Sequence, residues 1–87
     1  MATATPAPSP NPNALRFALD TTLADTMSYA NAGEAEAAGD PFGTAVFACE
    51  GVASIFGVND FVTITRQAGA DWEPIIEAVQ AAARDHL

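Results

Sequence analysis

Two side chains in this 87-residue chain could bind a transition metal: the single cysteine, Cys49, and the single histidine, His86. Iron–sulfur clusters are usually held by several cysteine thiolates, and a structural zinc ion takes four ligands. Cys49 lies on the apolar stripe of a predicted helix, where a cysteine packs as a small hydrophobic residue. We therefore expect no metal and no cofactor, with His86 solvated at a helix end. A reactive or ligating Cys49 is the alternative.

The remaining polar residues form no recognisable catalytic or cation site. Glu34, Glu36 and Asp40 could offer oxygen ligands, but they lack the alternation and glycine of a calcium loop, so we expect a solvated acidic loop. Ser54 has no adjacent base, and the glycines show no phosphate-loop pattern. We predict that the chain is not an enzyme. A buried carboxylate with a shifted pKa in a clear pocket would argue otherwise.

The charge of the chain is one-sided. Three arginines, no lysine and eleven carboxylates give a net charge of −8, which disfavours nucleic acid and anionic membranes. The acidity favours basic partners, although the plainer interpretation is a high-GC or salt-adapted proteome that favours Ala, Asp and Glu over Lys. One cysteine excludes an internal disulfide framework, no apolar run could span a bilayer, and residues 1–13 do not resemble a secretory signal. We expect a cytoplasmic protein whose oligomeric state the sequence leaves open.

The first half of the chain predicts a tail and two strands. Residues 1–9 carry no large side chain, so we expect a disordered tail followed by one domain over residues 10–87. Residues 14–19 alternate apolar and polar, as in a half-buried strand. Residues 26–29 alternate again, and we expect them to pair antiparallel with the first strand. Residues 31–39 are interpreted as a loop in which 34–38 could form a helical turn.

The second half predicts a helix, a hairpin and a final helix. Asp40 and Pro41 are typical of a helix start, and Gly51 is placed to end that helix in a left-handed conformation. Residues 52–56 and 61–66 predict a hairpin, and residues 72–86 a helix. The order is β-β-α-β-β-α, an α+β fold with two layers, in which a mainly antiparallel sheet carries both helices on one face. The core should come mostly from the large residues Phe17, Phe42, Phe47, Phe56, Phe61 and Trp72.

Three segments resemble the N-terminal domain of the Nfu/NifU iron–sulfur scaffold family. They are the Pro-Asn-Pro-Asn turn with its Leu-Arg-Phe strand (10–17), the Asp-Pro-Phe helix that leads to Glu-Gly-Val (40–52), and the Asn-Asp-Phe hairpin whose strand ends in arginine (54–66). Trp72 at the start of the last helix also fits. The resemblance covers residues 10–87 and implies a two-layer α/β fold.

The polar residues inside these motifs are the candidate interaction residues: Asn11, Asn13, Arg16, Asn59, Asp60 and Arg66. The arginines could anchor a partner carboxylate. The plainer interpretation is that the asparagines and the aspartate bond their own turns, and that strand cations protect sheet edges from self-pairing.

In the family that the chain resembles, a separate domain with a C-x-x-C motif holds the cluster. The resemblance therefore implies an accessory, non-catalytic module that stands alone, contacts iron–sulfur assembly components or client proteins, and binds no cluster itself. The alternative function is a peptide- or anion-binding module unrelated to iron–sulfur clusters. It would use the sheet or the loop between the strands predicted at 52–56 and 61–66.

Overall fold

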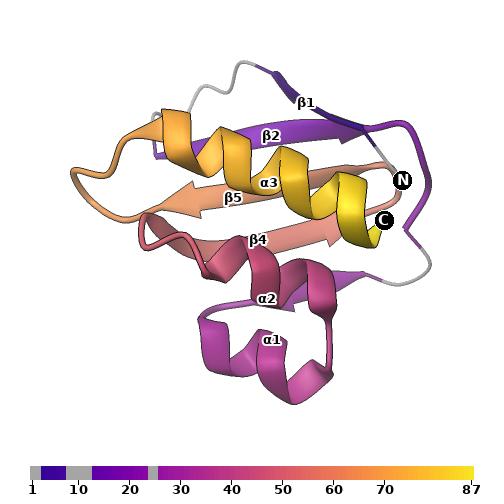
Figure 1. Cartoon of the computed structure of the whole chain (residues 1–87), viewed down its shortest axis with the longest axis horizontal. Coiled ribbons are helices and arrows are strands. Elements are labelled where there is room, and N and C mark those ends of the chain that lie inside the picture. The colour runs from indigo at the N-terminus through magenta and orange to yellow at the C-terminus, as the bar shows by residue number, and fades with distance from the viewer. Residues whose placement is uncertain (1–2, 8–12, 24–25) are drawn as a thin grey trace.

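The computed structural model describes residues 3–7, 13–23 and 26–87, which form one sheet and three helices (Figure 1). The strands follow the order β1-β2-β5-β4-β3, and each neighbouring pair is antiparallel. The elements are β1 (Ala4–Ala7), β2 (Ala14–Leu19), β3 (Met27–Tyr29), α1 (Ala32–Ala38), α2 (Pro41–Phe47), β4 (Val52–Val58), β5 (Phe61–Arg66) and α3 (Trp72–His86).

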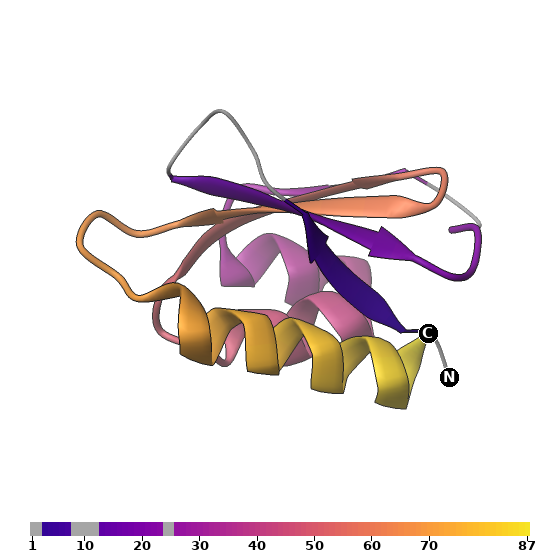
Figure 2. The same cartoon turned by 90° about the horizontal axis from the view of Figure 1, so that it is seen from above.

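The helices all lie on one face of the sheet, so the molecule has two layers (Figure 2). The core fills the space between the layers, and its largest fully buried side chains come from strands β2, β4 and β5 and from helices α2 and α3: Phe17, Phe42, Val46, Ile55, Val62, Ile64, Ile75 and Val79. This confirms the predicted α+β class and the placement of the helices on one face. Strand β5 and helix α3 have the predicted bounds.

The first strand of the sheet lies where the sequence predicts a disordered tail, and that prediction is wrong for Ala4–Ala7. These residues pair with β2 from Ala4 opposite Leu19 to Ala7 opposite Arg16. Backbone hydrogen bonds, rather than large side chains, hold the strand, and its edge position tolerates Pro6. Residues 1–2 and 8–9 of the predicted tail lie outside the described residues.

Strand β3 exists as predicted, but its expected partner is wrong. It pairs with β4, with Met27 opposite Gly57 and Tyr29 opposite Ile55. Strand β2 already has β1 on one side and β5 on the other, so both rows of its backbone groups are occupied. Strand β3 therefore lies at the far edge of the sheet.

Helix α1 occupies the segment interpreted as a loop, so the structure supports the alternative of a helical turn at 34–38, which begins two residues earlier. Asn31 is its N-cap and accepts from the Glu34 amide at 3.0 Å, while Glu34 Oε1 accepts from the Ala30 amide at 3.2 Å. The two bonds resemble a capping box shifted by one residue. Gly39 ends the helix with φ 67°, a left-handed conformation that costs glycine little.

Helix α2 begins as predicted and ends earlier. Asp40 caps it and Pro41 follows, but the helix stops at Phe47. Gly51 does not have the predicted positive φ. Its lack of a side chain matters for packing, because a Cβ there would lie 3.1 Å from both Ala70 Cβ and Ile75 Cδ1.

Candidate functional site

No helix covers the sheet face opposite the three helices, and we call it the open face (Figure 2). Side chains alternate across a strand, so the register assigns its members. These outward residues are Thr5, Ala7, Ala14, Arg16, Ala18, Ser28, Ser54, Phe56, Val58, Phe61, Thr63 and Thr65.

Two large residues expected in the core belong to this face. Phe56 is 45% exposed and is the one large hydrophobic residue classed as exposed among the described residues. Phe61 is half-buried. Alternation within FVTITR already places Phe61 on the face opposite Val62 and Ile64, and that signal could have identified it. Phe56 could have been found in the same way, since it follows Ile55 in a strand.

Arg16 lies on the open face beside Phe61. Its guanidinium carbon is 3.9 Å from the centroid of the Phe61 ring, which is a cation–π distance. Strand β2 is internal to the sheet, so the interpretation of Arg16 as a guard of a sheet edge is wrong. The ring positions the guanidinium on an exposed, apolar surface.

Arg66 instead makes hydrogen bonds to other segments of the chain. One of its terminal nitrogens, Nη1, donates to the Ala70 carbonyl at 2.6 Å, and its Nε lies 3.4 Å from Asn13 Oδ1. The guanidinium carbon also lies 5.6 Å from the Trp72 ring. Arg66, like Arg16, is on an internal strand. It joins the end of β5 to the start of α3 and to the entry of β2.

Asn59 and Asp60 form the turn between β4 and β5. Asn59 has φ 56°, a left-handed conformation that asparagine tolerates. Their carbonyls accept from the Leu23 and Leu19 amides at 2.6 and 2.7 Å. The candidate residues are therefore spread over the open face and both ends of the sheet, and do not form one cluster. Asn11 lies outside the described residues.

Tyr29 and Asp40 form a polar contact that the sequence did not indicate. The Tyr29 hydroxyl donates to Asp40 Oδ2 at 2.6 Å, while Asp40 Oδ1 accepts from the Phe42 and Gly43 amides. Burial raises the pKa of the Tyr29 phenol to about 12, and the hydrogen bond and charge of Asp40 act in the same direction. The contact fixes β3 to the start of α2.

The residues considered as metal ligands form no metal site in the part of the chain that the structure describes. Within residues 3–7, 13–23 and 26–87, no group of three His, Cys, Asp or Glu side chains could hold a metal ion. Cys49 is half-buried against the core, which is less buried than we expected, and His86 is exposed. No helix of the described part of the chain is long and apolar enough to cross a membrane.

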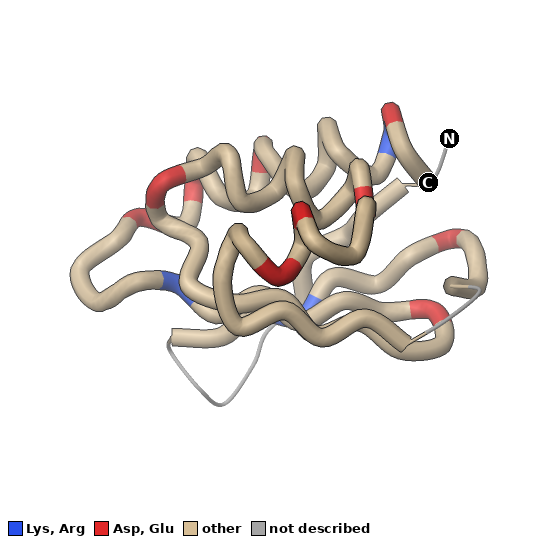
Figure 3. Tube along the Cα trace, turned by 90° about the horizontal axis from the view of Figure 1, so that it is seen from below, with Lys and Arg blue, Asp and Glu red and all other residues tan. Residues whose placement is uncertain are grey.

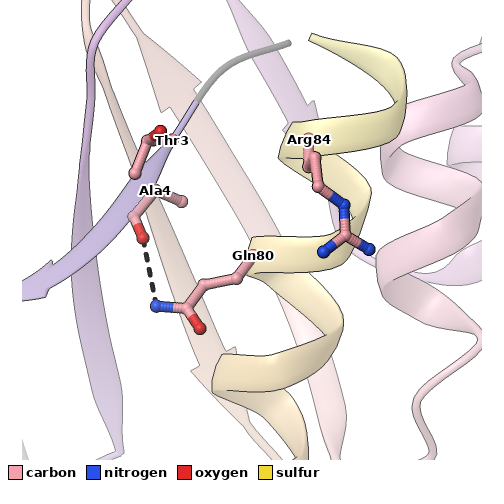
Figure 4. Close-up of a pocket in the computed structure, with 4 residues that line it drawn as sticks. All are labelled: Thr3, Ala4, Gln80 and Arg84. Atoms are coloured by element: carbon pink, nitrogen blue, oxygen red, sulfur yellow. Dashed lines mark hydrogen bonds between the residues drawn. The ribbon is translucent and has the colours of Figure 1, made fainter.

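Small hollows lie on the surface of the described part of the chain. One, of about 170 Å³, lies between β1 and α3 and is lined by Thr3, Ala4, Gln80 and Arg84 (Figure 4). The Gln80 amide donates across it to the Ala4 carbonyl at 3.2 Å. Another, of about 280 Å³, adjoins Tyr29 and Asp40. Small-molecule sites usually occupy roughly 300–1,000 Å³, so the open face is the stronger candidate site.

Comparison with solved structures shows the same fold in other proteins. The crystal structure of protein SAV1430 from Staphylococcus aureus has a TM-score of 0.74 at 25% identity, over 92% of this chain and 96% of that chain. SeR13 from Staphylococcus epidermidis has a TM-score of 0.60 at 26% identity, over 92% of each chain. A NifU-like protein from Saccharomyces cerevisiae has a TM-score of 0.76 at 22% identity, over 94% of this chain and 73% of that chain.

Sequence comparison assigns the family. A search among curated protein sequences found no match. The sequence model described as "Scaffold protein Nfu/NifU N terminal" matches residues 5–87, a range that includes most of β1. With the two-layer fold and the motifs already described, this match shows that the chain belongs to the Nfu/NifU N-terminal domain family.

Proposed function

We propose that this chain is a non-catalytic protein-contact module that serves iron–sulfur cluster assembly or delivery in the cytoplasm without holding the cluster. The family match over residues 5–87 carries the proposal. Its partners would be assembly components or client proteins rather than nucleic acid or membrane.

The small number of possible ligands supports the proposal that the chain holds no cluster. Clusters are usually held by several thiolates, and the chain has one cysteine. Cys49 is half-buried against the core. A cluster at Cys49 would need other ligands close by, and the described residues provide no such group.

Affinity capture from the native cytoplasm tests the proposal, with iron and sulfide assayed on the same sample. We expect iron–sulfur assembly proteins or their clients among the captured proteins. After anaerobic reconstitution, the isolated wild-type chain should be colourless and hold far less than one iron per chain. Cys49→Ala is the matched control and should give the same iron content.

Two results would contradict the proposal. A stable brown cluster on the isolated chain that Cys49→Ala removes would make the chain a cluster carrier. If the captured proteins are all unrelated to cluster assembly, the result would favour the other function, a peptide- or anion-binding module.

A further inference from the structure

We propose that the open face binds another protein, whose contact surface is apolar, carries a carboxylate opposite Arg16 and is bordered by basic residues. This inference rests on the proposed function, because it assigns a surface to the same protein contact. It is carried by the apolar side chains, the position of Arg16 and the distribution of charge.

The apolar part of the open face is continuous across two strands. Phe56 lies between Ser28 and Thr63 on the neighbouring strands, so small hydroxyl side chains flank its ring and leave it 45% exposed. Val58 is opposite Phe61 on the same face. Exposed apolar residues that stand next to one another are typical of interaction sites, whereas single ones are common on any surface.

Arg16 gives this surface a charge preference. It is the only charged residue among the outward residues of the open face. The Phe61 ring lies 3.9 Å from its guanidinium carbon, and Arg16 has no ion pair with an acid among the described residues. A guanidinium held on an aromatic ring is well placed for a carboxylate.

The surroundings of the face have the opposite charge. The five strands contain no Asp or Glu, and the acidic residues of the described chain lie on helices and connections (Figure 3). Asp20 and Asp60 flank the end of the sheet near Phe61. A partner with basic residues around its apolar centre would therefore match, whereas a second copy would bring two chains of net charge −8 together.

The extents of the molecule set an upper limit to the size of the open face. The longest Cα extents of the molecule are 31 and 26 Å, and they span the plane of the sheet. Their product, about 800 Å², is an upper bound on the area of the face, so a standard protein–protein interface, in which each partner buries about 800 Å², would cover the whole of it.

Photo-cross-linking tests this surface. Phe56 is replaced by p-benzoylphenylalanine, and the matched control carries the same residue at Glu77, an exposed position on α3. Each chain is irradiated in native cytoplasm, and the cross-linked segment is identified by mass spectrometry. We expect a cross-linked protein from position 56 and not from position 77, through a segment that is apolar and contains Asp or Glu.

A charge series then tests Arg16. Arg16→Glu should lower the cross-linked yield from position 56 about tenfold, as expected when an anchoring ion pair becomes a repulsion. Arg16→Lys should retain most of the yield. Arg84→Glu makes the same change in net charge on α3 and should change the yield less than twofold. Circular dichroism checks that each variant is folded.

The outcomes separate this inference from the proposed function. If assembly proteins cross-link from position 77 and not from position 56, the proposed function is supported and the proposed contact surface is wrong. Other proteins that cross-link from position 56 with the Arg16 dependence would support the surface and contradict the function. A cross-link between two copies, equal losses for Arg16→Glu and Arg84→Glu, or no cross-link from position 56 would overturn the inference.

Discussion

Tyr29 allows a direct test at the scale of one residue, because the chain has no other tyrosine. Its phenolate absorbance should rise with a midpoint at about pH 12, rather than at the ordinary value of about 10. Asp40→Asn should move the midpoint down, since it removes a negative charge. If circular dichroism shows that the chain is folded and the midpoint is near pH 10, the result would contradict the Tyr29–Asp40 contact.

The same shift sets the sign of a stability change. The neutral phenol is favoured by the fold, so its contribution is complete below about pH 10 and is lost as the pH rises to about 12. The free energy of unfolding, measured with urea, should fall over this range in the wild type. It should fall less in Tyr29→Phe, which has no group to titrate there.

Residue by residue, the sequence indicated the candidate polar residues but not their tasks. Arg16 and Arg66 are the cations of two alternating strands, yet one lies over a ring on the open face and the other bonds the Ala70 carbonyl. Strand periodicity gives the face of a residue, whereas its bonds depend on segments far away in the sequence. The Tyr29–Asp40 bond was missed for that reason.

At the scale of an element, packing around helix α2 predicts a stability change opposite to the one that helix propensity alone predicts. Gly43→Ala should stabilise an isolated helix by about 1 kcal/mol. In this fold the new Cβ would lie 2.9 Å from Tyr29 Cε2 and 3.1 Å from Ala35 Cβ. We expect a net destabilisation of about 1–2 kcal/mol, as overpacking usually produces, and urea unfolding would measure it.

A second substitution controls for the cause. In a Tyr29→Ala background, Gly43→Ala should become much less destabilising, because the ring that it would strike is absent. If Gly43→Ala alone raises the urea midpoint, helix propensity outweighs the contact and the packing of β3 against α2 is looser than the distances indicate.

Elements with strong local signals were predictable, and those held by tertiary pairing were not. Asp40-Pro41 and the β-branched run 61–66 specify their own structure. Strand β1 has no such signal, because it consists of Ala, Thr and Pro and depends on the edge of β2. Helix α1 was predicted only as the alternative to a loop although Asn31 and Glu34 mark its start, because the glycines and alanines around them obscured the cap.

At the scale of the whole molecule, the net charge of −8 predicts a dependence on salt. Raising NaCl from 10 to 150 mM shortens the Debye length from about 30 to about 8 Å. This should weaken self-repulsion and stabilise the fold by about 1 kcal/mol, or about 5 °C in Tm. At pH 4, near the isoelectric point of about 4.1, the effect should largely vanish, and an equal effect at both pH values would refute a charge origin.

The strand order was the least predictable feature. The sequence indicated four strands, and local pairing placed the second beside the first, yet β2 pairs with β5 and β3 with β4. Neighbours in a sheet that are far apart along the chain leave no short-range pattern. The hairpin of β4 and β5 was predictable because its strands are close together along the chain, although the strand predicted at 52–56 extends to Val58.

That order also affects how the chain is made. Ala14 pairs with Thr65, so β2 completes its pairing with β5 only after residue 65 has been synthesised. Until then the nascent chain exposes an apolar strand whose backbone groups lack that partner. Such intermediates are prone to aggregation, so ribosome-associated chaperones would have their greatest effect before β5 emerges from the ribosome.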